Sequence, residues 1–231
     1  MTTTRGPGWY GKLPSTGDFI QHRLSETTAS RWDNWFQSGL EAWHQHYPHD
    51  LAFLHAPVWH FILPVTLGIP RIQLGVIVPS QDRIGRIWPL LAIQNVTADS
   101  WQPALTGQVN NWLFSLSQPL QDAVSQSQSP QTLAHNIAKL PPCPMLKPGE
   151  EEKKPGDTGP PDPVRPAWRQ AASQFDPYQY TSYWWTLRAH QQTLKTYRHS
   201  GKLTAQLFTL LFNPEPGALA GRNGLYPPMF E

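Results

Sequence analysis

Three apolar segments follow one another closely in the first half of the chain, and they limit the possible folds more than any other feature. They cover residues 58–63, 72–78 and 87–96, and all are rich in Val, Ile or Trp. The connections at 64–70 and 79–85 are short and contain proline and glycine. This pattern predicts three β-strands. Because a parallel neighbour needs a crossover of about a dozen residues or more, the short connections predict an antiparallel meander.

Segments with helical periodicity surround these strands. Between Thr27 and Tyr47 the apolar residues recur every three or four positions, which predicts a helix with one apolar stripe and an N-cap at Ser25 or Thr27. The stripe contains Trp32, Trp35, Phe36, Leu40 and Trp43. Further helices are predicted at 103–125, from Ser129-Pro130 onward and at 203–212, and further strands at 183–187 and 194–197. The expected fold is a layered α/β sandwich, with a largely antiparallel central sheet of at least five strands flanked by helices.

The chain of 231 residues has the length of one domain with an insertion. Nine prolines and few bulky aliphatic residues lie between 141 and 166, so this stretch cannot bury enough apolar surface to offset its ordering entropy. We expect a single domain over 5–213, interrupted by a disordered proline-rich insertion at 141–166. Residues 214–231 are expected to form a flexible C-terminal tail.

Composition excludes several classes of function. The net charge is +2, only 15% of residues are charged, and no basic stripe is interleaved with aromatic residues, so nucleic-acid binding is not expected. The only cysteine is Cys143, which fits a reducing compartment. The N-terminal residues do not resemble a signal peptide, and no apolar run approaches the roughly 20 residues that a membrane span needs. We therefore expect a cytoplasmic protein that does not insert into membranes.

The residue types that catalyse reactions or bind metal ions in other proteins form no recognisable catalytic or metal-binding pattern in this sequence. Five histidines lie between His44 and His60, but His44 and His46 would point about 200° apart around a helix. Their spacings match no zinc motif. Cys143 lies among prolines, and Gly11-Lys12 is not followed by the Ser or Thr of a phosphate-binding loop. We therefore predict no catalytic, cofactor-binding or metal-binding residues, no small-molecule substrate and no enzymatic activity.

Two glycine-containing segments remain distinctive, one at 11–19 and the other at 75–90. The second contains a short charged turn between two apolar strands. The candidate partner-binding residues in these segments are Lys12, Asp18, Asp82, Arg83 and Arg86. One interpretation is structural: Arg83 or Arg86 pairs with Asp18 and locks the two turns together. The other is functional: the turn is a rigid element whose arginines bind a carboxylate or phosphate of a partner.

Five motifs in a fixed order resemble the TagF/ImpM family, whose members are associated with bacterial type VI secretion. The resemblance extends over roughly residues 8–212 and excludes the proline-rich stretch. Tyr183 departs from the family pattern, in which this position is more often Leu. The motifs are G-K-x-P-x-x-G-D-F at 11–19, W-x-x-W at Trp32 and Trp35, A-P-V-W-H-F at 56–61, P-S-x-D-R-x-G-R-x-x-P-L at 79–90 and S-Y-W-W-T at 182–186.

The resemblance implies a cytoplasmic α/β domain that represses the secretion machine after translation. It also implies a protein partner, the forkhead-associated scaffold through which phosphorylation activates that machine. The family has no established catalytic residues, which agrees with the lack of a recognisable catalytic pattern in this sequence. Two alternatives remain open: a structural or assembly component of the same machine, and a small-molecule-binding or enzymatic domain.

Overall fold

The computed structural model of the chain describes residues 6–47, 51–145, 174–187 and 193–213. Most of the expected insertion, from residue 146 onward, and the expected tail at 214–231 lie outside these ranges, so both expectations stay predictions.

A seven-stranded sheet forms the centre of the molecule, in the order β2-β1-β5-β4-β3-β6-β7. Every neighbouring pair is antiparallel. This confirms the predicted α/β fold with a largely antiparallel sheet, and the meander appears as β3-β4-β5. The strands are β1 (Gly8–Gly11), β2 (Ile20–His22), β3 (Trp59–Leu63), β4 (Ile72–Val78), β5 (Leu90–Val96), β6 (Thr181–Leu187) and β7 (Thr193–Ser200).

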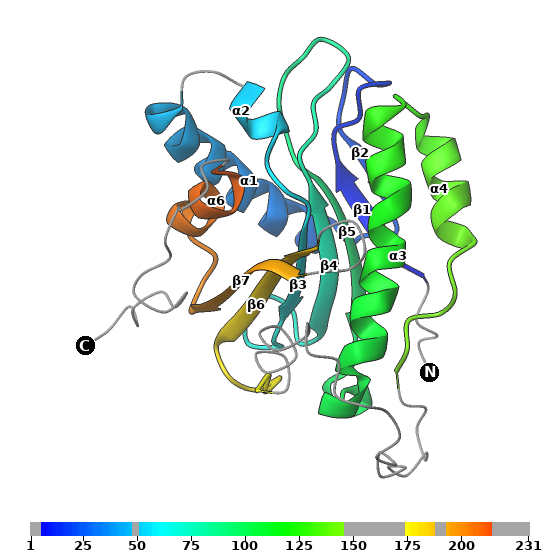
Figure 1. Cartoon of the computed structure of the whole chain (residues 1–231), viewed down its shortest axis with the longest axis vertical. Helices are drawn as coiled ribbons and strands as arrows, with labels where there is room; N and C mark the ends of the chain where they lie inside the picture. The colour runs from blue at the N-terminus through cyan, green and yellow to red at the C-terminus, as the bar shows by residue number, and fades with distance from the viewer. Residues whose placement is uncertain (1–5, 48–50, 146–173, 188–192, 214–231) are drawn as a thin grey trace.

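Helices cover both faces of the sheet (Figure 1). On one face lie α1 (Glu26–His46), the short α2 (Leu51–Leu54) and α6 (Ala205–Phe212). On the other lie α3 (Thr106–Ser125) and α4 (Pro130–Ala138). The predicted caps are present: the side chain of Ser25 accepts a hydrogen bond from the Thr28 amide, and that of Ser129 accepts one from Thr132.

The apolar stripe of α1 forms the centre of the first core. Phe36 and Trp43 are completely buried and pack with Phe53 and Phe208. Two buried indoles also fix α6 to this face, because Trp35 Nε1 donates to the Thr204 carbonyl at 2.8 Å and Trp59 Nε1 donates to Leu211 at 2.6 Å. The stripe is therefore core, as its spacing predicts.

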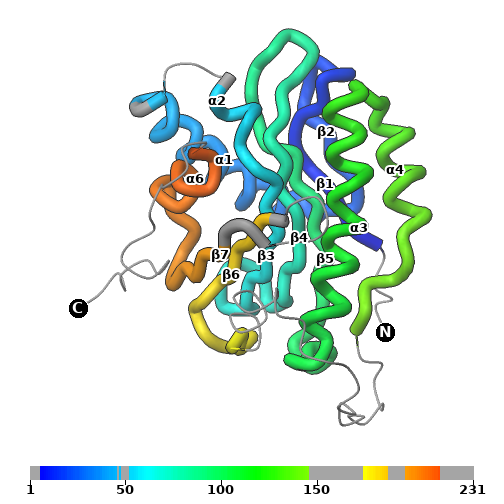
Figure 2. Tube along the Cα trace, in the orientation of Figure 1, coloured from blue at the N-terminus to red at the C-terminus, as the bar shows by residue number. Residues whose placement is uncertain are grey.

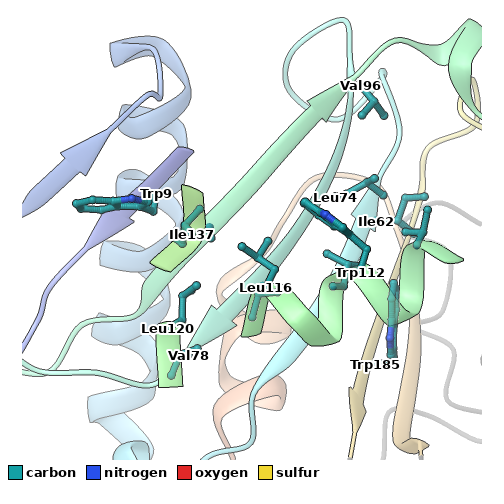
Figure 3. Close-up of a cluster of buried hydrophobic side chains, with 14 of the residues drawn as sticks. Trp9, Ile62, Leu74, Val78, Val96, Trp112, Leu116, Leu120, Ile137 and Trp185 are labelled. Carbon is teal, nitrogen blue, oxygen red and sulfur yellow. The ribbon is translucent and has the colours of Figure 1, made fainter. Parts of the chain in front are cut away.

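The second core lies between the sheet and α3 (Figure 3). Trp112, Leu116 and Leu120 point from α3 toward the aliphatic side chains of β3 and β4. Trp185 of β6 closes this core, and its indole N–H donates to Asn110 Oδ1 at 2.9 Å. The indole therefore brings apolar area and a satisfied polar group to the same place.

The structure differs from the sequence expectations at two places. Glycine and proline at intervals over residues 5–24 indicate a loop or an irregular strand. The structure forms the short strands β1 and β2 there, and they pair at one edge of the sheet. The strand expected from Ile87 begins only at Leu90. Ile87 forms an isolated bridge to Gln81, and Pro89, which lacks an amide hydrogen, separates this bridge from the β4–β5 ladder.

Gly39 marks the closest approach of α1 to α6, and it provides a test of this packing. A Cβ at Gly39 would lie 2.2 Å from Phe208 Cγ, whereas a Cβ at Gly107 of α3 would meet nothing within 4 Å. We expect Gly39→Ala to lower the free energy of unfolding by about 1–3 kcal/mol, because overpacking outweighs the gain in helix propensity. Gly107→Ala, the control, should change it by less than about 1 kcal/mol, upward or not at all. Urea unfolding of both variants measures the difference.

His60 gives the fold a specific pH dependence. It is 2% exposed in β3, and burial lowers the pKa of its imidazole to about 4, although backbone groups of Trp185 and Leu113 oppose the shift. Because the unfolded chain binds this proton near pH 6.5, stability should fall by up to about 3 kcal/mol as the pH drops from 7 to 4. His60→Leu should remove the His60 contribution and so make the slope shallower, whereas His135→Gln on the exposed side of α4 should retain the wild-type slope. An unchanged slope in His60→Leu would contradict the assignment.

Candidate functional site

Two loops lie together at one end of the sheet (Figure 2). One joins β1 to β2, and the other joins β4 to β5. They meet because the end of β1 runs beside the start of β5. Gly11 allows this contact: it has φ +141°, and a Cβ there would lie 2.2 Å from the Pro89 carbonyl oxygen. The sequence therefore brings its two distinctive segments to one place.

Asp82 is the centre of this site, and its carboxylate is 0% exposed. Oδ2 lies 3.1 Å from Lys12 Nζ and accepts a hydrogen bond from Arg86 Nε at 2.6 Å. Oδ1 accepts from the backbone amides of Ile84 at 3.1 Å and Arg86 at 2.9 Å. Burial alone would raise the pKa of Asp82, but the bonds from Arg86 and Lys12 outweigh burial and hold it at about 2.

Hydrogen bonds to the main chain lock the two loops to each other. Arg86 Nη2 donates to the Gly17 carbonyl at 2.7 Å, and the Arg83 amide donates to the Thr16 carbonyl at 2.8 Å. The buried Ser80 hydroxyl donates to the Lys12 carbonyl at 2.8 Å. The structural interpretation is therefore right that an arginine locks the turns. It is wrong about the acidic partner, which is Asp82 of the same turn rather than Asp18.

Lys12 lies inside the site and does not face solvent. Its side chain is 7% exposed, and the ammonium group lies 4.9 Å from the centre of the Phe19 ring and 5.9 Å from that of Trp88. The carboxylate of Asp82 and these ring faces compensate the buried charge. Lys12 and Asp82 therefore support the loops from beneath, and of the five candidate residues only Asp18, Arg83 and Arg86 can touch a partner.

Two apolar side chains that were not among the candidate residues complete the exposed surface. Ile84 is 69% exposed at the tip of the β4–β5 loop, and Phe19 is 46% exposed. Phe19 is nevertheless held in place, stacked on Tyr10 with ring centres 5.6 Å apart and edge-on to Trp88 at 5.0 Å. We call Asp18, Phe19, Arg83, Ile84 and Arg86 the loop-pair surface.

A signal for these two residues was present in the sequence. Phe19 ends the G-K-x-P-x-x-G-D-F segment, and Ile84 is an aliphatic residue inside a charged turn, between Arg83 and Gly85. Aliphatic side chains at the tip of a turn have no core to enter. The candidate residues named from the sequence are all charged, so neither Phe19 nor Ile84 is among them.

The described residues contain no group of three or more His, Cys, Asp or Glu side chains placed to share a metal ion. His49 lies outside the described ranges. Within those ranges, none of the helices combines the length and hydrophobicity that crossing a bilayer requires.

Known proteins resemble this chain in sequence and in fold. Residues 8–140 match the family model of the TagF N-terminal domain, described as type VI secretion system-associated. Among solved structures, the crystal structure of PA0076 from Pseudomonas aeruginosa PAO1 is similar, with a TM-score of 0.70 and 25% sequence identity. The likeness covers 90% of this chain and 94% of PA0076. No curated protein matches the sequence.

Since the family match takes in more than half of the chain, including both loops of the site, the chain belongs to the TagF N-terminal domain family. It is therefore a type VI secretion-associated protein. The matched range ends before the S-Y-W-W-T motif of β6, which the structure places beside β3.

The buried ion pair can be tested by removing its charges separately. Asp82→Asn leaves the Lys12 ammonium group buried without a counter-ion, so we expect a loss of about 3–5 kcal/mol in the free energy of unfolding. Arg86→Gln removes a guanidinium that is 57% exposed, so its loss should stay near 1 kcal/mol. The double variant Lys12→Met/Asp82→Asn should lose less than the sum of the single losses. Chemical denaturation at pH 7 of these three variants and of the single variant Lys12→Met measures all four values.

The pH profile supplies a second check of the same pair. Because the pKa of Asp82 falls from 3.8 to about 2, its contribution to stability is present above about pH 4 and disappears as the pH falls toward 2. This window lies below that of His60. If Asp82→Asn retained the wild-type stability, the pair would not hold the loops.

Proposed function

We propose that the chain is a non-enzymatic cytoplasmic repressor of type VI secretion that acts by binding a protein partner through the loop-pair surface. The partner is the forkhead-associated scaffold protein of the secretion machine, as the family resemblance implies. The single observation that carries the proposal is a pair of rigid loops that expose two apolar side chains, Phe19 and Ile84, together with the cations Arg83 and Arg86.

Rigidity is the first support for a binding role. The loops are tied by Arg86 to Gly17 and by Arg83 to Thr16, so the surface loses little conformational freedom when it binds. Phe19 and Ile84 are two of the four large hydrophobic side chains that are exposed among the described residues. An exposed apolar group on a fixed loop is typical of a contact surface.

The chemistry of the charged residues supports binding over catalysis. Asp82 is ionised, buried and bonded through both oxygens, and with a pKa of about 2 it is a poor general base at neutral pH. The Arg83 side chain is exposed, and it forms no ion pair with any described residue. Its guanidinium can therefore bind a carboxylate or phosphate of the partner. The partner surface should be acidic around an apolar recess that receives Ile84.

The proposal predicts that two exposed side chains matter for binding and leave the fold intact. We expect Arg83→Ala and Ile84→Ala each to weaken binding of the purified forkhead-associated scaffold by about 10- to 100-fold, as residues central to an interface do. Calorimetry measures the affinity, and the thermal melting curve should not change. In the native cell, both variants should raise type VI secretion.

Matched controls are available elsewhere on the surface. Tyr178→Ala removes an aromatic side chain that is 63% exposed, and Lys139→Ala removes an exposed cation after α4. Both should bind and repress like the wild-type protein. Full binding by Arg83→Ala and Ile84→Ala would exclude this surface. A wild-type chain that does not bind the scaffold would exclude the partner, and loss of secretion on deleting the gene would favour an assembly role.

A further inference from the structure

A second candidate site lies at the opposite end of β4. The hollow has a volume of about 410 Å³ and lies between α1, the turn joining β3 to β4, and the connection between β7 and α6. Gln73, near the start of β4, lines it, whereas the loop-pair surface follows the end of that strand. Figure 1 shows that the β3–β4 turn and the β4–β5 loop lie at opposite ends of the sheet.

Two indoles form an apolar wall of this hollow. The Trp32 and Trp35 side chains line it together with Leu63, Leu67 and Leu203. The indole N–H groups are already used, since Trp32 Nε1 donates to Gln73 Oε1 at 3.3 Å and Trp35 Nε1 donates to the Thr204 carbonyl at 2.8 Å. Trp32 and Trp35 are 3% and 6% exposed, so each presents only a small apolar part of its ring to an occupant, without a hydrogen-bond donor.

The charged groups around the hollow are all positive. Arg31 of α1 and Lys202 before α6 line it from different walls, and no Asp or Glu of the described residues lines it. Both cations are exposed, and neither forms an ion pair with a residue in the described ranges. The Arg31 guanidinium extends over the turn, where Nη1 would lie 3.0 Å from a Cβ at Gly68. An apolar hollow with two unpaired cations is complementary to a ligand with an apolar body and a negative charge.

We propose that this hollow binds a small amphipathic organic anion, with its apolar body against Trp32 and Trp35 and its carboxylate between Arg31 and Lys202. The volume falls within the range of roughly 300–1,000 Å³ that is usual for small-ligand sites. Guanidinium and ammonium groups both bind carboxylates through charge-assisted hydrogen bonds. The proposal is independent of the loop-pair surface, because it uses different residues.

The test compares an anion with its neutral isostere. We choose 1-naphthaleneacetate and 1-naphthaleneacetamide, which differ in charge and share the aromatic body. Calorimetry should give a dissociation constant below about 1 mM for the acid and a value at least about tenfold higher for the amide. Binding of the acid should shift the indole N–H signals of Trp32 and Trp35 in NMR spectra.

Variants on the rim locate the site without disturbing the core. Arg31→Gln and Lys202→Gln should each weaken binding of the acid about 5- to 10-fold, with an unchanged melting curve because both side chains are exposed. Lys139→Gln is the charge-matched control and should bind like the wild type. Ser38→Phe, which fills the hollow from α1, should abolish binding.

Three outcomes would overturn the proposal. These are equal affinity for the acid and the amide, unchanged affinity in both Gln variants, and no binding of the acid at about 5 mM. Equal affinity would mean that the ligand's negative charge is not required. Unchanged affinity in both Gln variants would place the ligand elsewhere, and absence of binding would mean that the hollow does not take this class of ligand.

Discussion

Burial of the central sheet on both faces is the constraint on which the rest of the structure depends. Every residue of β3 and β4 is buried. Antiparallel sheets often leave one face to solvent, but here that would expose Trp59, Phe61 and Ile77. The sheet must therefore be covered twice, and the tryptophan stripe of α1 and the leucine face of α3 supply the two covers. The same constraint keeps His60 neutral at pH 7, because burial disfavours its charged form and lowers its pKa.

Because both faces of the central strands are covered, other molecules can reach the sheet through its ends, its edge strands and the outer surfaces of its helices. At one end, the β1–β2 and β4–β5 loops are joined around Asp82, which accepts four hydrogen bonds or ion contacts from Lys12, Ile84 and Arg86. At the other end, the β3–β4 turn borders an apolar hollow beside α1. The two candidate sites are therefore separated by the length of β4 and differ in kind, one projecting and the other concave.

The sequence was most informative where local periodicity and tertiary burial agree. The α1 stripe, the cap at Ser129 and the β3-β4-β5 meander follow from spacing and turn residues alone, whereas the sequence left the α1 cap open between Ser25 and Thr27 and the structure selects Ser25. The edge strand β2 and its neighbour β1 are short, and the glycines of β1 resemble loop punctuation. The pairing of β1 therefore depends on its contact with β5 and not on local propensity. The short helix α2 gave no signal, since four residues are too few to show periodicity.

The candidate site could be predicted in its location but not in its arrangement. The charged residues of 11–19 and 79–90 indicated that the two segments belong together. Which acid pairs with Arg86 depends on backbone geometry, because the turn brings the Asp82 carboxylate to the amides of residues 84 and 86. The roles of Lys12 and Phe19 also depend on the three-dimensional structure. A lysine is ordinarily expected at the surface and a phenylalanine in the core, but Lys12 is buried and Phe19 is exposed. Here the ring covers the ammonium group.

The position of the Phe19 ring over Lys12 has a consequence for the effect of ionic strength. Salt screens charges that solvent reaches, and it screens buried pairs much less. The Lys12–Asp82 contact should therefore hold the loops in one conformation from dilute buffer to high salt. Attraction between the exposed Arg83 and an acidic partner is subject to screening, so salt would slow the encounter while the shape of the surface stays the same. The buried charges of Lys12 and Asp82 thus maintain the form of the loops, whereas the exposed charge of Arg83 is the one that the proposed interaction would use.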